Sequence, residues 1–189
     1  MSAQDSKLFV ISGPSGAGKG TLVTRVRERR SNLGLTVSAT TRAPRKGEVD
    51  GVNYFFLTRE EFDRRVANGE FVEWAEVHGN CYGTLVSEVQ SKLASGASLI
   101  LEIDVQGALQ VKERFPEAVL IFIKPPSLEV LRERLVGRGT ETPETIELRM
   151  ANAVDELALA DRYDDVVVND DLDRATDELV RVLDMHERI

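Results

Sequence analysis

The chain has 189 residues, a formal net charge of −8, 42% hydrophobic residues and a single cysteine. This length fits one domain with small inserted subdomains, and it buries roughly 70% of the unfolded chain's surface without staples. The negative charge argues against nucleic acid held by general charge attraction, and one cysteine excludes an internal disulfide. The sequence also has no His/Cys cluster that would indicate a zinc site. No apolar run fits a signal peptide or reaches the ~18 residues of a membrane span, so a cytoplasmic protein is expected.

Short apolar runs alternate with helical patterns along the chain. Four runs suit strands that are buried on both faces, and each lies next to a helical segment. These runs are Lys7–Ser12, Ser98–Asp104, Ala118–Ile123 and Asp165–Asn169. The first is followed by glycines and then by a predicted helix at Thr21–Arg29. Repeated strand–helix units predict an α/β fold with a mainly parallel central sheet.

Residues 35–84 depart from this rhythm and are rich in β-forming segments. Three short strands are predicted there, at Leu35–Ala39, Asn53–Leu57 and Phe71–His78. Thr58 starts a capping box that opens a helix to about Asn68, and Trp74 is expected in the core. The segment predicts a small inserted subdomain.

A second break is the polar, glycine-bearing stretch Gly137–Pro143 between two helical patterns. Pro143 is suited to the first turn of the following helix, where its missing N–H costs nothing. Five apolar residues of that helix recur at helical spacing and are expected to face inward: Ile146, Met150, Ala153, Val154 and Leu157.

The residues Gly-Pro-Ser-Gly-Ala-Gly-Lys at 13–19 match the pattern G-x-x-x-x-G-K between a predicted strand and a predicted helix. The glycines let backbone N–H groups turn inward around a phosphate, and the helix N-terminus adds partial positive charge. Lys19 can then reach the β- and γ-phosphate oxygens. The loop predicts an ATP site formed by Gly13, Pro14, Ser15, Gly16, Ala17, Gly18, Lys19, Gly20 and Thr21.

The loop departs from its usual pattern at Gly20, where Ser or Thr normally supplies a hydroxyl to magnesium. Mg²⁺ is still expected with ATP, because it usually binds through substrate phosphates and few protein ligands. No direct ligand is assigned. The candidates are the hydroxyls of Thr21 and Ser15, the phosphates and water alone, and Asp104 acting through water.

The segment Thr40–Leu57 points to the phosphate acceptor. Arg42 and Arg45 flank Pro44, which stiffens the backbone between them. Two guanidinium forks so placed suit a single phosphate, and Tyr54 adds a hydroxyl donor. A basic surface loop beside acidic patches is the alternative interpretation.

The sequence closely resembles the guanylate kinase family over nearly the whole chain. The matching residues are Thr40-Thr41-Arg42, Arg45, Glu48, Gly51, Tyr54-Phe55-Phe56, Gly69–Ala75, Tyr82–Thr84, Asp104–Gly107, Gly137–Thr142 and Val168–Leu172. The resemblance implies transfer of the γ-phosphoryl group of ATP to GMP. It implies a P-loop nucleoside monophosphate kinase-like α/β fold with a central parallel sheet. Its parts would be a core (1–33, 85–133 and 150–189), a β-rich GMP-binding subdomain (34–84) and a helical lid (134–149).

The resemblance also implies which residues bind GMP. Arg42, Arg45, Tyr54 and Tyr82 would hold its phosphate, whereas Ser38, Glu73 and Thr84 would read the guanine. Guanine presents two donors, N1–H and the 2-amino group, and one carboxylate can accept from both. Adenine offers no such pair, so Glu73 is the expected discriminator.

Glu102 and Asp104 are expected on one face of a strand because they are two residues apart. One of the two would touch GMP and the other would order magnesium through water. The family often has Asp where Glu102 stands and Ser where Thr84 stands.

On the ATP side, the resemblance places Arg134, Arg138 and Arg149 in the lid, the last two on the transferring phosphoryl group. The predicted catalytic set is Lys19, Arg45, Arg138 and Arg149, which align the substrates and neutralise charge. Arg134 has an alternative reading as a surface i,i+4 partner. Asn169 and Asp170 follow an apolar run, where ligands meet parallel sheets, and are expected at the ATP site.

Three other functions stay open. A P-loop kinase with another acceptor would be revealed by a panel of nucleoside monophosphates. A non-catalytic protein-binding module usually has a degraded P-loop, whereas Lys19 and the lid arginines are present here. A nucleotide-gated regulator is supported by no specific feature. The expected partners are ATP and GMP, without nucleic acid or membrane, and the residues do not indicate an oligomeric state, donor preference or regulation.

Overall fold

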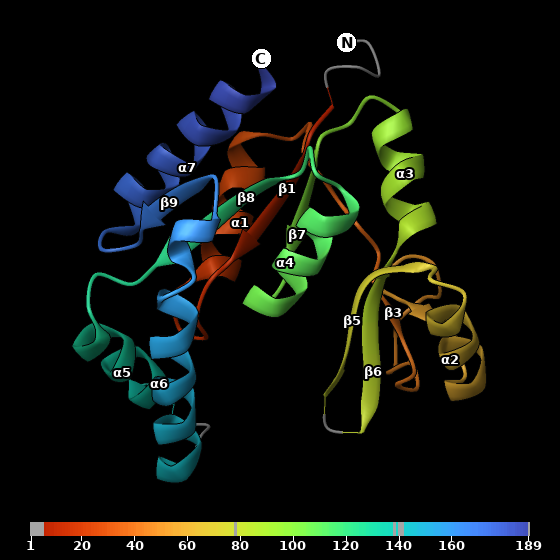
Figure 1. Cartoon of the computed structure of the whole chain (residues 1–189), viewed down its shortest axis with the longest axis horizontal. Coiled ribbons are helices and arrows are strands. Elements are labelled where there is room, and N and C mark those ends of the chain that lie inside the picture. The colour runs from red at the N-terminus through yellow and green to blue at the C-terminus, as the bar shows by residue number, and fades with distance from the viewer. Residues whose placement is uncertain (1–5, 78, 138, 140–141, 189) are drawn as a thin grey trace.

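Five parallel strands form the central sheet of the computed structural model, in the order β2-β7-β1-β8-β9 (Figure 1). The structure describes residues 6–77, 79–137, 139 and 142–188. The strands are β1 (Leu8–Ser12), β2 (Gly34–Leu35), β7 (Leu99–Glu102), β8 (Val119–Lys124) and β9 (Asp165–Val168). Because every pair is parallel, the carboxyl ends of these strands meet at one edge of the sheet.

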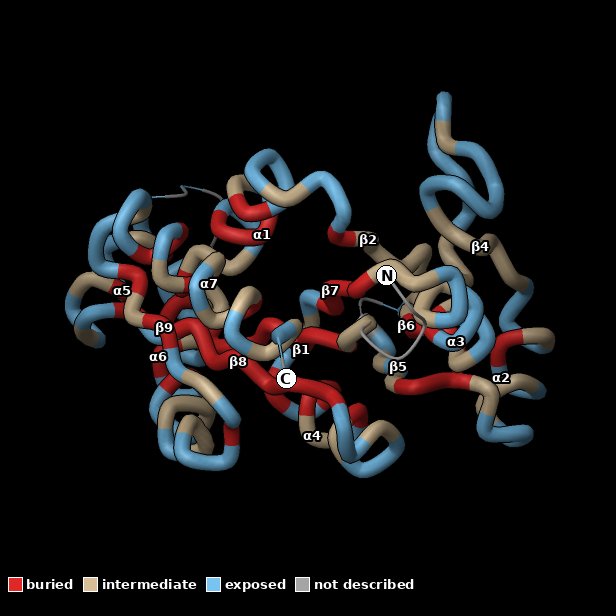
Figure 2. The backbone as a smooth tube through the Cα atoms, turned by 90° about the horizontal axis from the view of Figure 1, so that it is seen from above, coloured by how far each residue is buried: buried red, intermediate tan, exposed pale blue. Residues whose placement is uncertain are grey.

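Helices cover both faces of this sheet, which explains the apolar, buried residues of β1, β7 and β8. The edge strand β9 is not buried on both faces, contrary to the prediction, since Val166 is 40% exposed. The helices are α1 (Lys19–Arg29) and α7 (Leu172–Glu187) on one face, and α3 (Val86–Ala94) and α4 (Val105–Arg114) on the other. Along β1, Phe9 and Ile11 pack toward α1 and α7, whereas Leu8 and Val10 pack toward α3 and α4. Figure 2 shows β1, β7 and β8 as the buried middle of the molecule, with α1 and α4 on opposite sides.

The second sheet belongs to a smaller unit beside the first. Its order is β4 (Phe55–Phe56), β3 (Ala39–Thr40), β6 (Asn80–Leu85) and β5 (Phe71–Val77), and α2 (Arg59–Ala67) packs against it. Phe62 of α2 stacks on Phe71 of β5, with ring centres 4.3 Å apart. The N-cap of α2 is Thr58, whose hydroxyl accepts a hydrogen bond from the N–H of Glu61 at 3.1 Å, as predicted.

The helices α5 (Leu128–Gly137) and α6 (Pro143–Leu157) form a pair with an apolar cluster of its own. Pro143 is the first residue of α6, as expected from the sequence, and Thr142 caps the helix. A short 3₁₀ turn, η1 (Ala160–Arg162), leads into β9. The helical pair and the second sheet flank the same end of the central sheet on opposite sides (Figure 1).

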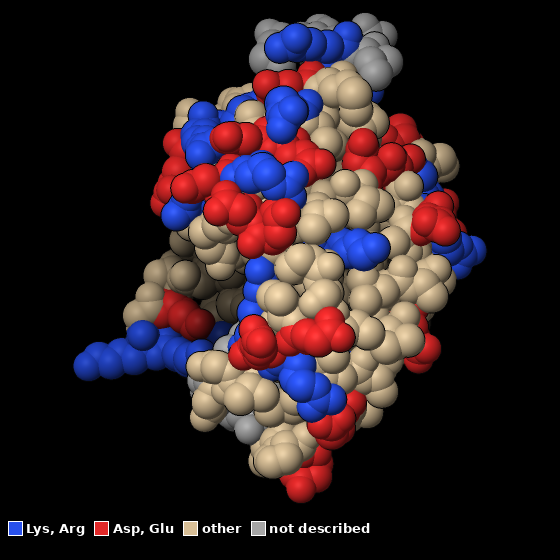
Figure 3. Space-filling view, turned by 90° about the vertical axis from the view of Figure 1, so that its left-hand side faces the viewer, with Lys and Arg blue, Asp and Glu red and all other residues tan. Residues whose placement is uncertain are grey.

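Ion pairs tie α7 to α1 along the surface. The pairs are Arg25–Asp173, Arg29–Asp177, Arg30–Asp184 and Arg30–Glu187. Acidic and basic side chains are accordingly intermixed over the face drawn in Figure 3, where the described residues form no continuous basic patch. Within the described part of the chain, none of the helices combines the length and the apolar character that crossing a membrane requires.

Three local predictions were wrong. The expected strand Leu35–Ala39 is split, because Leu35 ends β2 in the central sheet and Ala39 begins β3 in the second sheet. Trp74 is 44% exposed, since β5 is the edge strand and the indole contacts Phe62 only edge-on. Val154 is 51% exposed, because α5 covers only a narrow stripe of α6.

Candidate functional site

A glycine-rich turn joins β1 to α1 at the carboxyl edge of the central sheet. The loop approaches its neighbours too closely for side chains at two positions. A Cβ on Gly13 would lie 2.2 Å from the carbonyl oxygen of Ile123, and one on Gly18 would lie 2.3 Å from Nδ2 of Asn169. Both glycines also have positive φ angles, 142° and 91°. The loop is therefore seated tightly against β8 and the end of β9.

Lys19 lies at the start of α1, and its ammonium group points back into the loop. Nζ donates hydrogen bonds to the carbonyl oxygens of Gly13 at 2.6 Å and Pro14 at 3.2 Å. The N-terminus of an 11-residue helix and a lysine thus converge on the same small volume. This arrangement suits the phosphates of a nucleotide.

Two residues expected at the ATP site donate hydrogen bonds that hold the backbone of the loop. The buried amide of Asn169 donates to the carbonyl oxygen of Ala17 at 2.8 Å. The guanidinium of Arg134 donates to the carbonyl oxygens of Asn169 at 2.8 Å and Ala17 at 3.4 Å. Both side chains therefore position the P-loop backbone, a role that the sequence did not reveal because it depends on contacts between distant segments.

A pocket of about 370 Å³ opens beside these contacts. Its lining brings together half of the predicted ATP-binding residues, from three segments: Gly16, Gly18, Thr21, Arg134, Asn169 and Asp170. Leu172, which was not predicted, also lines it. Asp170 is exposed and accepts hydrogen bonds from Arg174, so the Arg174 guanidinium holds the pKa of that carboxyl below its ordinary value.

The helical pair reaches the P-loop through Arg149 of α6, which donates a hydrogen bond to the hydroxyl of Ser15. The predicted catalytic residue Arg138 lies outside the described residues. Glu156 is a candidate that the sequence analysis missed. Burial raises the pKa of its carboxyl, and the nearby charge of Lys19 opposes the shift. Its spacing of seven residues from Arg149 places both on one side of α6, which is the signal that could have found it.

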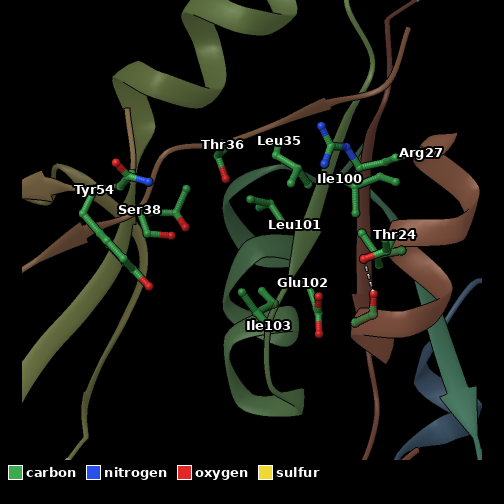
Figure 4. Close-up of a pocket in the computed structure, with 14 residues that line it drawn as sticks. Thr24, Arg27, Leu35, Thr36, Ser38, Tyr54, Ile100, Leu101, Glu102 and Ile103 are labelled. Carbon is green, nitrogen blue, oxygen red and sulfur yellow. Dashed lines mark hydrogen bonds between the residues drawn. The ribbon is translucent and has the colours of Figure 1, made fainter. Parts of the chain in front are cut away.

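A second pocket, of about 400 Å³, lies between α1, β7 and the second sheet (Figure 4). Ser38 and Tyr54 border it on the side of the second sheet, and Thr24 and Arg27 border it on the α1 side. Thr84 and Glu102 also line it. The six residues named here come from five segments that are at least eleven positions apart in sequence, so only the fold brings these walls together.

Arg42 is held in place by Glu48, which the sequence had marked only as part of the family pattern. The guanidinium donates to the two carboxylate oxygens of Glu48 at 2.8 and 3.0 Å and lies 5.4 Å from the centre of the Tyr54 ring. The Arg42 hydrogen bond lowers the pKa of the Glu48 carboxyl. The ring of Tyr82 lies 6.2 Å from that of Tyr54. Arg45 lies in the exposed loop nearby, where its backbone N–H bonds Glu48 at 2.6 Å.

Glu73 and Thr84 form a cross-strand pair between β5 and β6. The Thr84 hydroxyl donates to a carboxylate oxygen of Glu73 at 2.8 Å. Burial raises the pKa of the Glu73 carboxyl, the Thr84 hydrogen bond opposes this, and the charge of Asp104 adds to it. The Glu73 carboxylate is thus held in one orientation by Thr84, which itself lines the second pocket.

Glu102 and Asp104 do not share the face of one strand, contrary to the prediction. The strand β7 ends at Glu102, and Asp104 is the N-cap of α4, with Oδ1 accepting from the N–H of Gly107 at 2.7 Å. The Glu102 carboxylate lies beside the P-loop helix, because a Cβ on Gly20 would be 3.4 Å from its Oε1. Desolvation raises the pKa of the Glu102 carboxyl, and the Lys19 charge opposes this shift.

A phosphate-binding loop thus begins α1, and a second pocket lined by Tyr54 and Thr84 lies on the other side of that helix. Arg42 contacts Tyr54, and the half-buried carboxylate of Glu73 is bound to Thr84. A protein-family model described as guanylate kinase matches residues 5–186. The chain belongs to the guanylate kinase family. It is 52% identical over 183 residues to a guanylate kinase of Halalkalibacterium halodurans, covering 97% of this chain and 90% of that protein. It is 57% identical over 178 residues to one of Gloeobacter violaceus, covering 94% and 87%.

A solved structure supports the same assignment. The guanylate kinase from Anaplasma phagocytophilum matches with a TM-score of 0.71 and 36% sequence identity, covering 96% of this chain and 86% of that one. The expected nucleoside monophosphate kinase-like fold is therefore confirmed. The enzyme transfers the γ-phosphoryl group of ATP to GMP and gives ADP and GDP. ATP and GMP are its substrates.

Proposed function

We propose that the two pockets divide the substrates, with GMP between α1 and the second sheet and ATP on the P-loop. The observation that carries this assignment is the Glu73–Thr84 pair, a half-buried carboxylate fixed by a hydroxyl at the acceptor pocket. Guanine can donate N1–H and its 2-amino group to that carboxylate. Ser38 lines the same pocket and adds a hydroxyl near the base.

The GMP phosphate is held by Arg42, Arg45, Tyr54 and Tyr82 in this proposal. Arg42 is pre-organised, because Glu48 and the Tyr54 ring already fix its guanidinium. Arg45 is exposed and brings a second fork when the phosphate arrives. Because Arg42 is already ordered, the conformational entropy lost on binding the phosphate comes mainly from Arg45.

Transfer of the phosphoryl group needs alignment and charge neutralisation rather than a protein nucleophile. Lys19 exchanges its bonds to the carbonyl oxygens of Gly13 and Pro14 for bonds to phosphate oxygens. Arg149, which lies against Ser15 of the P-loop, and Arg138 supply further positive charge. Arg134 and Asn169 stabilise the conformation of the P-loop, because Asn169 bonds the carbonyl oxygen of Ala17 and Arg134 bonds that of Asn169. Glu156 contributes a carboxylate near Lys19.

Magnesium fits this site through Glu102. Where a P-loop usually has a hydroxyl residue, this chain has Gly20, and the Glu102 carboxylate lies 3.4 Å from the place of its missing Cβ. Among the described residues no group of three or more His, Cys, Asp or Glu is arranged to hold a metal, so phosphates and water supply the remaining ligands. Asp104 is engaged as a helix cap, and Thr21 lines the donor pocket. When bound, Mg²⁺ neutralises charge on the β- and γ-phosphates.

We further propose that residues 34–84 form the GMP-binding subdomain and 134–149 the lid of a core made by 1–33, 85–133 and 150–189. Separate apolar clusters in the second sheet and in the α5–α6 pair support this division. Their closure over the substrates excludes water, which would otherwise accept the phosphoryl group. A cytoplasmic location and the absence of nucleic-acid and membrane partners stay predictions.

A coupled assay of ADP formation with GMP, AMP, CMP and UMP tests the acceptor assignment. We expect rapid ADP formation with GMP, and rates with the other three that are lower by about a hundredfold or more, which corresponds to ~2.7 kcal/mol. A rate with AMP that comes within about tenfold of the GMP rate would contradict guanine selection by this pocket. The same assay with chelator and added Mg²⁺ tests the requirement for the metal.

A further inference from the structure

The core of the molecule holds the segment that leads into β5 at three successive carbonyl groups. The carbonyl oxygen of Gly69 accepts a hydrogen bond from Nη2 of Arg114 at 2.7 Å. That of Glu70 accepts from the N–H of Val86 at 2.9 Å, and that of Phe71 accepts from Nη1 of Arg114. Arg114 is the last residue of α4, and Val86 is the first of α3. The segment that leads into β5 is therefore fixed by α3 and α4, the two helices that cover one face of the central sheet.

The pairing between β5 and β6 shifts register at this point. Phe71 is opposite Leu85, but Glu73 is already opposite Thr84, so β5 contains one extra residue there. The side chains of Phe71, Val72 and Glu73 consequently enter three different surroundings. Phe71 packs in the cluster of the second sheet, Val72 packs in the cluster of the central sheet, and Glu73 pairs with Thr84 at the acceptor pocket. A β-bulge re-aims side chains in this way, and bulges are common beside active sites.

Helix α4 supports β5 along its length. At the start of the helix, the place of a Cβ on Gly107 is 3.7 Å from Cβ of Glu73. At the end of the helix, Arg114 binds the carbonyl groups that precede the bulge. Gly69 permits this approach, because its φ is 68° and a Cβ there would lie 3.2 Å from Nη2 of Arg114. The position of Glu73 relative to the core is thus set from both ends of α4.

We propose that Arg114 is a positioning residue for guanine recognition. Its guanidinium holds the carbonyl groups of Gly69 and Phe71, keeps the bulge at Val72 in place and so aims the Glu73 carboxylate at the base. A guanidinium can bind both carbonyl groups at once, because its donors form a planar fork, whereas an ammonium group is a point donor. The inference rests on the proposed role of Glu73.

The test compares four variants with the wild type: Arg114→Met, Arg114→Lys, Glu73→Gln and Arg181→Met. Arg181 is the matched control, because it is an exposed helical arginine whose one hydrogen bond within the described part of the chain goes to the carbonyl of Asp177 in its own helix, at 3.3 Å. The measurements are kcat and KM for GMP and for IMP, which lacks the 2-amino group, and KM for ATP. A cooperative thermal unfolding transition serves as the check that each variant is folded.

We expect Arg114→Met to lower the ratio of kcat/KM for GMP to that for IMP at least about threefold, through a higher KM for GMP. Since the P-loop is not affected, KM for ATP stays within about twofold. Arg114→Lys, which reaches one carbonyl group, gives an intermediate ratio, and Arg181→Met gives the wild-type ratio. Amide exchange of residues 71–74 becomes faster in both Arg114 variants, which reports the looser bulge directly.

An unchanged ratio in folded Arg114→Met, together with a lowered ratio in Glu73→Gln, would overturn the role of Arg114 and leave that of Glu73 intact. An unchanged ratio in Glu73→Gln would instead reject the proposed function of Glu73 and the inference with it. If Arg114→Met does not fold, Arg114→Lys decides alone. A wild-type ratio with wild-type exchange in that variant would then overturn the proposal.

Discussion

The hydroxyl of Thr84 donates its single proton to the carboxylate of Glu73 across β5 and β6, at 2.8 Å. This bond leaves the lone pairs of the hydroxyl free to accept, and it orients the carboxylate before any base arrives. Both residues are therefore set to accept hydrogen bonds at the same place. An acceptor-rich end of a pocket favours guanine, whose N1–H and 2-amino groups both donate.

Glu73→Gln should lower kcat/KM for GMP at least about tenfold. The new amide N–H₂ faces a guanine donor, and losing a hydrogen bond to a charged group costs on the order of 1.5–3 kcal/mol. IMP should be less affected, because the phosphate contacts remain and it has no 2-amino group. Steady-state kinetics with both nucleotides check this. The same GMP-to-IMP ratio in wild type and variant would remove Glu73 as reader of the 2-amino group and favour Glu102 or Asp104.

GMP binding should weaken as the pH falls through the raised pKa of Glu73. Burial raises that pKa above its ordinary 4.5, with Thr84 opposing and Asp104 reinforcing the shift. Recognition of two donors needs the ionised carboxylate, so KM for GMP rises as the pH falls below the pKa of Glu73. Because this pKa is raised, the rise begins at a higher pH than it would for an exposed glutamate. Glu73→Gln should abolish this part of the pH profile. A profile that is identical in the variant would assign the titration to another group.

The same shift has an opposite consequence for the free enzyme. The folded state binds the Glu73 proton more tightly than the unfolded state, whose pKa is near 4.5. The Glu73 contribution to the free energy of unfolding therefore rises as the pH falls from above the raised pKa toward 4.5, and it is lost at higher pH. Urea unfolding of wild type and Glu73→Gln at several pH values isolates this term, because the glutamine does not titrate. A wild-type minus variant difference that is flat with pH would contradict the raised pKa.

Lys19→Ala should lower kcat about a hundredfold, which corresponds to ~2.7 kcal/mol, while the fold survives. The reason is loss of the only P-loop side chain that is placed to neutralise charge on the transferring phosphoryl group. Lys7→Ala is the control, because Lys7 lies just before Leu8, at the end of β1 that is opposite to the P-loop. Activity of Lys19→Ala within about threefold of the wild type would exclude Lys19 from the catalytic set.

Arg42→Lys and Arg45→Lys should both raise KM for GMP, since each keeps its charge but loses the planar fork. The Arg42 variant should be the more affected, about tenfold or more, because it also breaks the paired bonds to Glu48 and the stacking on Tyr54. GMP titration and kinetics measure both. If the two variants bind GMP like the wild type, these arginines are surface charges only.

Local signals in the sequence determined a large part of this protein. The spacing of glycines before Lys19 places a phosphate loop between a strand and a helix, because backbone N–H groups can converge only where residues tolerate positive φ. Thr58 starts α2 and Pro143 lies in the first turn of α6, both as predicted, since capping and the fixed φ of proline act within one helical turn. The apolar runs of β1, β7 and β8 were recognisable because burial on both faces favours consecutive apolar residues.

Only the tertiary structure decided how these local pieces meet. Whether Leu35 and Ala39 lie in one sheet or two depends on which distant strands pair with them, β7 or β6. The exposure of Trp74 depends on β5 being an edge strand, and the cap role of Asp104 depends on where β7 ends. The bonds from Arg134 to the P-loop and from Arg114 to Phe71 join residues 117 and 43 positions apart. Such contacts leave no periodic trace in the chain, because their geometry is set by packing between elements rather than by neighbours in sequence.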